Sequence, residues 1–343
     1  MTEPYYYNQL SKAGQSCYHA MKSGLQKLAP SFQVPLLDGR DLSNIYFLLR
    51  MDCPEIFYSV TFRYKFYQDS GNAEVIPEYL FEKKKIQEHQ KALKSRVEKL
   101  ARPAMKLNEK EKLLYIHDFI CRNIRYDKLK KAYSHEIIGS LGQGVAVCEG
   151  IAKAVKILCD ALGIWCIIAL SENNPEKGIK YRHAWNIVRI GGQYYHFDAT
   201  FDNTLSSDTI IRYDYFMLSD KQIFRDHEPV IWKIPACNDS DHFYYKEKKI
   251  SFTKMEDVRK RSAQAVKKGK TLLFHWRGSY LTRAVLEEML AIFREEAENR
   301  QKHASVSINW SQAVLLVSFR DELPEQQVRM EEANEGEKEQ DTV

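Results

Sequence analysis

The 343-residue sequence predicts an α+β fold. After Cys148, apolar residues recur at spacings of three and four, which is typical of a helix. Two segments rich in β-branched and aromatic residues, 182–190 and 193–200, are separated by a glycine pair and predict a β-hairpin. Residues 245–322 again combine strand-like and helix-like segments, and such mixed elements pack as two layers.

The first 105 residues are predicted to form an N-terminal α+β region with two helices and a hairpin. These elements are expected at residues 5–28, 41–51, 54–67 and 75–81. Asp41 is expected to cap the second helix. Pro77 cannot donate to a central ladder, so the last strand is expected at an edge. We find no catalytic motif in this region and expect it to cover the core or to shape its substrate groove.

Residues 106–240 are predicted to form the core. Three amphipathic helices, one leading into the core and two within it, are expected at residues 82–104, 109–124 and 148–162. Pro103 should halt the first helix, and Asn108 should cap the second. His117 and Asp118 lie beside an apolar stripe, and we interpret them as packing and solvation partners rather than catalytic groups.

A small C-terminal α+β module is predicted at residues 241–323. The polar, turn-rich stretch ACNDSDH marks the boundary before it. The module should contain a strand with a turn, a helix and two further strands, at residues 270–280, 281–301, 304–310 and 313–321. No catalytic motif occurs in it.

The formal net charge of +5 conceals an acidic tail. Residues 324–343 contain seven acidic and two basic residues, a net charge of −5, which leaves +10 on residues 1–323. The tail is rich in Glu and Gln and poor in apolar residues, so it is predicted to be disordered. The hypothesis of nucleic-acid binding would rest only on the positive charge of residues 1–323. The basic clusters of the body are short, scattered and without a recognition motif, so they indicate a solvated surface and no nucleic-acid partner.

Cysteine usage and hydropathy argue against several classes of protein. The seven cysteines are scattered, with no C-x-x-C pair, which argues against a disulfide framework or a zinc site. We expect no metal and no cofactor. The start of the chain lacks the basic and apolar regions of a signal peptide, and no stretch approaches the roughly 18 uninterrupted apolar residues of a membrane span. These observations predict a cytoplasmic protein with no membrane partner.

Cys148 is the candidate nucleophile because it opens a predicted helix. Unpaired backbone N–H groups and the positive end of the helix dipole favour a thiolate there, and only the thiolate is a good nucleophile. The other six cysteines are interpreted as inert, since free cysteine is commonly a small buried hydrophobe. Three glycines precede the nucleophile and permit tight turns, although ordinary loop geometry explains them equally well: Gly139, Gly142 and Gly144.

A two-residue loop at the glycine pair fixes the register of the hairpin. The expected pairs are Ile190 with Gln193, Trp185 with Asp198, and His183 with Thr200. His183 and Asp198 then become diagonal neighbours on one face, within reach of a hydrogen bond between imidazole and carboxylate. A three-residue loop would place the two side chains on opposite faces.

Cys148, His183 and Asp198 would form a catalytic triad. His183 would hold the thiolate as an ion pair and protonate the leaving amine, while Asp198 fixes the imidazole tautomer. The backbone N–H of Cys148 and the side chain of Gln143 are candidate oxyanion donors. Trp185 would either form one wall of the site or belong to the core.

Two other polar residues of this stretch are interpreted as structural. His196 shares the predicted face of Asp198 and is a rival base, but it lies opposite Ile187, further down the hairpin than His183. Asp202 is expected to be a turn residue rather than a ligand.

Several separate motifs, in this order, resemble the transglutaminase-like superfamily, in its bacterial branch more than in its animal branch. They are V-C-x-G at the helix start, H-A-W-N-I-V and Y-H-F-D-A-T-F-D, flanked by YIHDFICRNIRYD and YDYFMLSDKQIFRDH. The resemblance covers roughly residues 108–230. It implies a papain-like α+β core with a Cys-His-Asp triad, and the three roles fall on Cys148, His183 and Asp198.

The chain departs from the animal enzymes next to the nucleophile. Glu149 stands where those enzymes have a tryptophan, and no upstream tryptophan matches their oxyanion stabiliser. Peptidases, amidases and inactive members share the scaffold, so the fold alone does not select a reaction. We expect acyl transfer from a peptide or protein amide through a thioester, to an amine or to water. The alternative is a non-catalytic binding or scaffold protein on the same fold.

Overall fold

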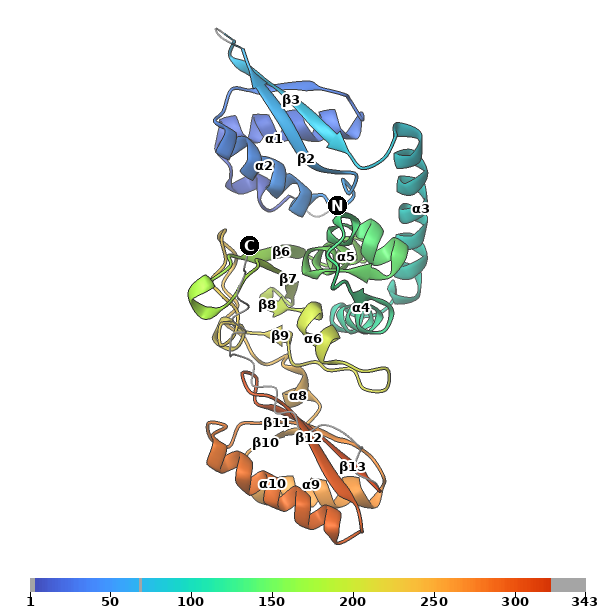
Figure 1. The fold of residues 1–343 in the computed structure, drawn as a ribbon, viewed down its shortest axis with the longest axis vertical. Coiled ribbons are helices and arrows are strands. Elements are labelled where there is room, and N and C mark those ends of the chain that lie inside the picture. The colour runs from blue at the N-terminus through green and yellow to red at the C-terminus, as the bar shows by residue number, and fades with distance from the viewer. Residues whose placement is uncertain (1–3, 68–69, 322–343) are drawn as a thin grey trace, which may run out of the picture. The chain divides into compact units, whose positions relative to one another are not determined.

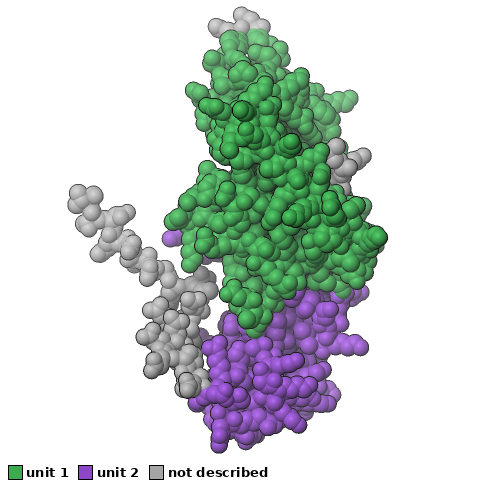
Figure 2. Space-filling model, turned by 90° about the vertical axis from the view of Figure 1, so that its right-hand side faces the viewer, with its two compact units in different colours: residues 1–171, 183–212, 230–238 green, residues 172–182, 213–229, 239–343 purple. Residues whose placement is uncertain are grey.

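A computed structural model describes residues 4–67 and 70–321. The chain divides into two compact units (Figure 2): residues 1–171, 183–212 and 230–238 form unit 1, and residues 172–182, 213–229 and 239–343 form unit 2. Both units combine helices and strands, which confirms the α+β class. The division into consecutive segments at residues 105, 240 and 323 stays a prediction. The tail expected at 324–343 lies outside the described residues.

The N-terminal part of unit 1 is a three-stranded antiparallel sheet with two helices packed against it (Figure 1). Its elements are α1 (Lys12–Gln26), β1 (Phe32–Pro35), α2 (Gly39–Asp52), β2 (Ser59–Phe66) and β3 (Asn72–Tyr79). Tyr46 of α2 packs on Phe62 of β2, with ring centroids 4.6 Å apart. The aromatic residues of the alternating β2 segment therefore anchor the sheet to α2.

Three expectations for this region are wrong. α1 begins only after Ser11, and α2 is capped by Asp38, whose carboxylate accepts from the N–H of Asp41 at 2.8 Å. β3 is the central strand, in the order β1-β3-β2, rather than an edge strand. The proline is tolerated there because β1 pairs with β3 only as far as Val75, so Pro77 is not required to donate to it.

The rest of unit 1 packs helices against a second antiparallel sheet. The helices are α3 (Lys83–Ala101), α4 (Glu109–Asn123), α5 (Cys148–Ala161) and α6 (Ala199–Leu205). The strands of this sheet that belong to unit 1 are β6 (Cys166–Ser171), β7 (His183–Ile190) and β8 (Gln193–Phe197), in the order β6-β7-β8. Asn108 caps α4 in a capping box with Glu111, which confirms the expected start of that helix. The buried amide of Asn186 on β7 donates to the carbonyl of Ala152 at 3.0 Å, which fixes α5 over the sheet.

The hairpin of β7 and β8 has the predicted register. Its ladder begins with Ile190 opposite Gln193, and the two glycines between them have φ values of 55° and 84°, the left-handed conformation of a two-residue loop. The ladder ends at Phe197 because Asp198 leaves the strand and caps α6. The pairs expected beyond that point are not formed: Trp185 with Asp198, and His183 with Thr200.

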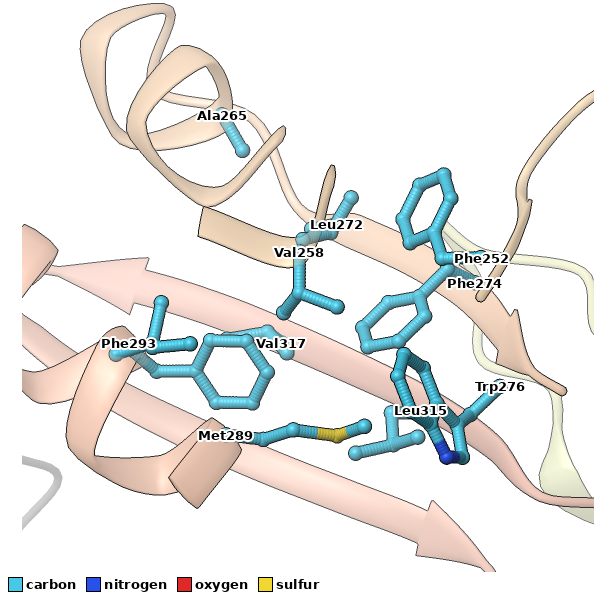
Figure 3. Close-up of a cluster of buried hydrophobic side chains, with 11 residues drawn as sticks. Phe252, Val258, Ala265, Leu272, Phe274, Trp276, Met289, Phe293, Leu315 and Val317 are labelled. Atoms are coloured by element: carbon cyan, nitrogen blue, oxygen red, sulfur yellow. The ribbon is translucent and has the colours of Figure 1, made fainter. Parts of the chain in front are cut away.

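Unit 2 contains a four-stranded sheet in the order β10-β11-β13-β12 and two long helices. These elements are β10 (Ser251–Phe252), α9 (Met255–Lys267), β11 (Leu272–Trp276), α10 (Arg283–Glu298), β12 (His303–Asn309) and β13 (Val314–Arg320). Phe274, Phe293 and Val317 meet in its apolar core (Figure 3). α10, β11, β12 and β13 confirm the expected elements, whereas α9 and β10 were not expected. Within residues 4–67 and 70–321, every helix is too short or too polar to span a bilayer.

Candidate active site

Cys148 is the first residue of α5, as the sequence predicts. Val147, the preceding N-cap residue, makes no side-chain hydrogen bond to the first turn, so the positive end of the helix dipole faces Cys148 without a side-chain cap. Two short strands, β4 (Arg125–Tyr126) and β5 (Val145–Ala146), pair in parallel and fix the backbone just before the cysteine. The cysteine itself is half-buried.

His183 and Asp198 form a buried hydrogen-bonded pair. Nε2 of His183 lies 2.7 Å from Oδ2 of Asp198. The other carboxylate oxygen, Oδ1, accepts from the N–H groups of Thr200 and Phe201 at 2.8 and 3.1 Å. One carboxylate therefore caps α6 and orients the imidazole, so the helix backbone determines how the imidazole is held.

His183 also shares a side-chain hydrogen bond with Cys148. Because Nε2 faces Asp198, Nδ1 is the nitrogen left for the sulfur. Burial alone would lower the pKa of His183, but Asp198 and then Cys148 outweigh it and raise the pKa from 6.5 to about 10. The imidazole is therefore cationic at neutral pH, the state that pairs with a thiolate. The structure brings the three predicted residues together.

Two aromatic rings hold the imidazole of His183. Trp185 stacks on it with centroids 5.7 Å apart and planes 15° apart, and Phe201 lies on it at 4.8 Å. The indole N–H of Trp185 donates to Nδ1 of His196 at 2.9 Å. Trp185 thus belongs to the buried core and also contacts the triad. His196 is fully buried and accepts this bond, which agrees with its interpretation as a structural residue.

Tyr126 lies beside the triad and was not identified from the sequence. It ends β4, opposite Ala146, and its hydroxyl lies within interaction range of the backbone N–H and the side chain of Cys148. Burial, Cys148 and Asp198 raise the pKa of Tyr126 to about 12, so the hydroxyl keeps its proton. Gln143, by contrast, is exposed at the end of the π-helix η4 (Ile138–Gln143), and its oxyanion role stays a prediction.

A cluster of buried and partly buried charges begins at Glu149, the residue after Cys148. Glu149 accepts from Nζ of Lys153 at 2.7 Å and lies 3.0 Å from Nδ1 of His135. Glu136 accepts from Lys153 at 2.8 Å and from Arg50 of α2. Burial would raise the pKa of Glu149, but Lys153, His135 and Arg50 hold it well below its usual range. The residue that replaces the tryptophan of the animal enzymes therefore anchors the first turn of α5.

A second cluster of Cys, His and Asp side chains lies between α4 and α6. Nε2 of His117 is 3.0 Å from Oδ2 of Asp202 and 3.8 Å from Sγ of Cys121. Burial would lower the pKa of His117, but Cys121, Asp118 and Asp202 raise it well above its usual value. His117 is thus a packing and pairing residue. The turn role expected for Asp202 is wrong, because Asp202 lies within α6 as the fully buried partner of His117.

A family comparison agrees with this arrangement. Residues 95–199 match the model of the transglutaminase-like superfamily. The likeness to this superfamily is therefore shown for this segment, which is less than a third of the chain. It contains α4, α5 and the β6–β8 sheet, and it ends at the first residue of α6, directly after Asp198.

Solved structures similar to the chain share low sequence identity with it. A structure described as "a TGase" is 11% identical, has a TM-score of 0.27 and covers 50% of this chain and 50% of its own. A "Putative Cysteine Protease" from Cytophaga hutchinsonii is 18% identical, with a TM-score of 0.28 over 41% of this chain and 62% of its own. A "putative protease" from Parabacteroides distasonis is 16% identical, with a TM-score of 0.24 over 40% of this chain and 36% of its own. The chain therefore spans less than two thirds of each of these structures. No curated protein matches the chain.

Proposed function

We propose that the chain is a thiol enzyme that attacks a peptide or protein amide with Cys148 and forms a thioester. One observation carries the proposal: His183 is bonded on one side to Asp198 and on the other to Cys148, at the N-terminus of α5. The geometry fits the three roles of a nucleophile, its base and the group that orients the base.

In the proposed reaction the Cys148 thiolate adds to the amide carbonyl carbon, and the carbonyl electron pair moves to oxygen. When the tetrahedral intermediate collapses, the C–N bond breaks and the imidazolium of His183 gives its proton to the leaving amine or ammonia. An amine or water then attacks the thioester while His183 accepts the proton of the incoming nucleophile. The C–S bond breaks, and the thiolate–imidazolium pair is restored.

The negative oxygen of the intermediate requires hydrogen-bond donors. We assign this role to the backbone N–H of Cys148 and to the hydroxyl of Tyr126, which lies beside that N–H and keeps its proton at neutral pH. Tyr126→Phe should therefore lower kcat by about 10²–10³, the usual effect of losing one such donor. Unchanged kcat in this variant would remove Tyr126 from the mechanism.

Thiol labelling tests whether Cys148 is activated. Limiting iodoacetamide near neutral pH, followed by peptide mass spectrometry, should label Cys148 faster than the other six cysteines. His183→Ala should slow this labelling, whereas replacement of His303, which is exposed on β12, should not. Equal labelling rates at all seven cysteines would refute the thiol enzyme and favour a non-catalytic binding protein.

A glutamine peptide separates the two outcomes of the thioester. The peptide would be offered with and without a primary alkylamine, and ammonia and the peptide adduct would be followed together. Ammonia with an amine adduct indicates transfer, and ammonia with a glutamate product indicates hydrolysis. A peptide containing only main-chain amides, followed by release of new amino termini, tests peptidase activity in the same format.

A further inference from the structure

A small cavity opens in unit 1 outside the superfamily segment. Its volume is about 250 Å³, and it lies among the N-terminal residues, α1, α2 and Trp232. Tyr6, Leu10, Leu48 and Trp232 form its apolar wall. Whole small-molecule ligands usually occupy pockets of about 300–1,000 Å³, so this cavity has the size for a single side chain.

Part of the apolar wall of the cavity belongs to a buried cluster against which Cys148 also packs. Tyr6 and Leu48 belong to this cluster with Ala152 of α5, and Cys148, Leu10 and Trp232 pack against it. The same buried cluster therefore supports the cavity and the proposed active site.

The sheet register relates the cavity to His183 on β7. Ser171 pairs with His183 on one side and forms an antiparallel β-bridge with Val230 on the other. Trp232 follows two residues later and therefore lies opposite Ala169, two residues along from the His183 end. With neighbouring strands about 4.8 Å apart and about 3.4 Å per residue, Trp232 is about 12 Å from His183. An extended peptide spans about 3.3–3.6 Å per residue, so a side chain in the cavity would come from within about four residues of the reacting one.

The wall is held rigidly. The ring of Trp232 stacks on Phe47, with centroids 5.3 Å and planes 24° apart, and meets Tyr6 edge-on at 6.0 Å. The hydroxyl of Tyr6 donates to the carbonyl of Ile168 at 2.5 Å. The main chain of Lys233 accepts from the side chains of Tyr5 and Gln9, both at 3.2 Å. A side chain entering the cavity would therefore meet a preformed surface.

The polar lining of the cavity has one sign of charge. Asp41, in the first turn of α2, and Asn44, one turn further, line it together with the apolar wall. Among the described residues that line the cavity, there is no lysine or arginine. An aromatic ring and a carboxylate beside an aliphatic wall suit a side chain with an apolar stem and a cationic end.

We propose that this cavity is a substrate subsite for a lysine or arginine side chain, within about four residues of the amide that reacts at Cys148. The stem of the side chain packs along Leu10 and Leu48, and its cation lies near Trp232 and Asp41. The proposal rests on the proposed function for the identity of the reacting amide. It does not require that the amide react, because the cavity binds the lysine or arginine side chain before Cys148 attacks the amide.

The test measures binding to a Cys148→Ala protein, in which no thioester forms. Fluorescein-labelled peptides with a single glutamine carry lysine, norleucine or glutamate at one neighbouring position, and fluorescence anisotropy gives Kd for each. The lysine peptide should bind about tenfold more tightly than the glutamate peptide. Asp41→Asn should reduce this ratio to about threefold or less, because it removes the charge and keeps the shape.

Two further variants complete the test. Glu98→Gln removes an exposed carboxylate of α3 that does not line the cavity, and it should leave the ratio unchanged. Trp232→Ala should weaken the lysine and norleucine peptides alike, and Trp232→Phe, which keeps a ring, should restore most of the affinity. Equal Kd values for the three peptides, or a lysine preference that survives Asp41→Asn, would overturn the subsite. A lysine preference in a protein whose Cys148 labels no faster than other cysteines would retain the subsite and refute the enzyme.

Discussion

Replacing Asp198 with asparagine tests the central pair of the proposed site. Asparagine keeps an oxygen that can accept from the N–H groups of Thr200 and Phe201, and it caps helices as well as aspartate does. The start of α6 should therefore persist. What is lost is the negative charge 2.7 Å from Nε2 of His183.

The expected effect follows from the pKa of His183. A rise from 6.5 to about 10 corresponds to a preference of about 5 kcal/mol for the imidazolium, to which Asp198 contributes first and Cys148 second. Without the carboxylate, burial favours the neutral ring, and the thiolate loses its cationic partner. Only the thiolate is a good nucleophile, so alkylation of Cys148 should slow in this variant.

The assay is the rate of iodoacetamide labelling at Cys148 as a function of pH. The unmodified protein should label faster than Asp198→Asn throughout the neutral range, because its imidazolium persists to about pH 10. The ratio of the two rates should be largest at acidic pH and shrink as pH rises. Asp198→Ala provides a control, since it also loses the helix cap. It should unfold at a lower urea concentration, with a free energy of unfolding about 1 kcal/mol smaller. Identical pH profiles for the unmodified protein and Asp198→Asn would refute the ion pair.

Three further predictions concern stability. His117→Gln leaves the carboxylate of Asp202 buried without its cation, so the free energy of unfolding in urea should fall by about 3–5 kcal/mol, and a loss below about 1 kcal/mol would contradict the buried pair. Gly139→Ala would place a Cβ 2.4 Å from a main-chain carbonyl oxygen and should cost about 1–3 kcal/mol. Gly142→Ala is the matched control, because its Cβ would meet only a side chain at 3.5 Å, and equal losses in the two variants would contradict the packing. Burial and then neighbouring cations lower the pKa of His275 to about 4, so protonation opposes folding. The stability that this histidine gives unit 2 is complete above pH 6.5 and should be lost as pH falls through about 4, by about 3 kcal/mol. In thermal unfolding at several pH values, His275→Gln should remove that loss, and an unchanged pH profile would refute the assignment.

Local sequence patterns predicted the elements whose causes are local. The apolar spacing after Cys148 and the glycine pair of the hairpin fix α5 and the register of β7 with β8, because neighbours in sequence decide both. The position of β3 could not be read in this way. The rule that places proline at an edge concerns one strand, whereas Pro77 is tolerated because another strand, β1, is short. α9 was missed because only Val258, Ser262, Ala265 and Val266 of its 13 residues are buried.

Cys148, His183 and Asp198, which the structure brings together, could be proposed as one site from the sequence because each lies in its own recognisable motif. The contacts of Tyr126, Asn186 and Arg50 could not be predicted in this way. Tyr126 reaches Cys148 through a parallel pairing of two strands of two residues each, too short to leave a periodic pattern. Arg50 meets Glu136 across 86 positions of sequence. Such contacts depend on tertiary packing, which residue spacing does not encode.

The buried guanidinium of Arg50 determines where the chain can be truncated without loss of stability. Arg50 lies outside residues 95–199, yet it pairs with Glu136 and stands 3.7 Å from Glu149. A fragment excised at the borders of sequence similarity would leave the buried carboxylate of Glu136 and the partly buried carboxylate of Glu149 to share the ammonium of Lys153, with His135 beside Glu149. Losing one partner of a buried pair costs about 3–5 kcal/mol, a large fraction of the stability of a typical domain. Residue 95 is thus where sequence similarity begins, but it is not the boundary of a stable folding unit. A fragment or chimaera that contains this core must also include α2.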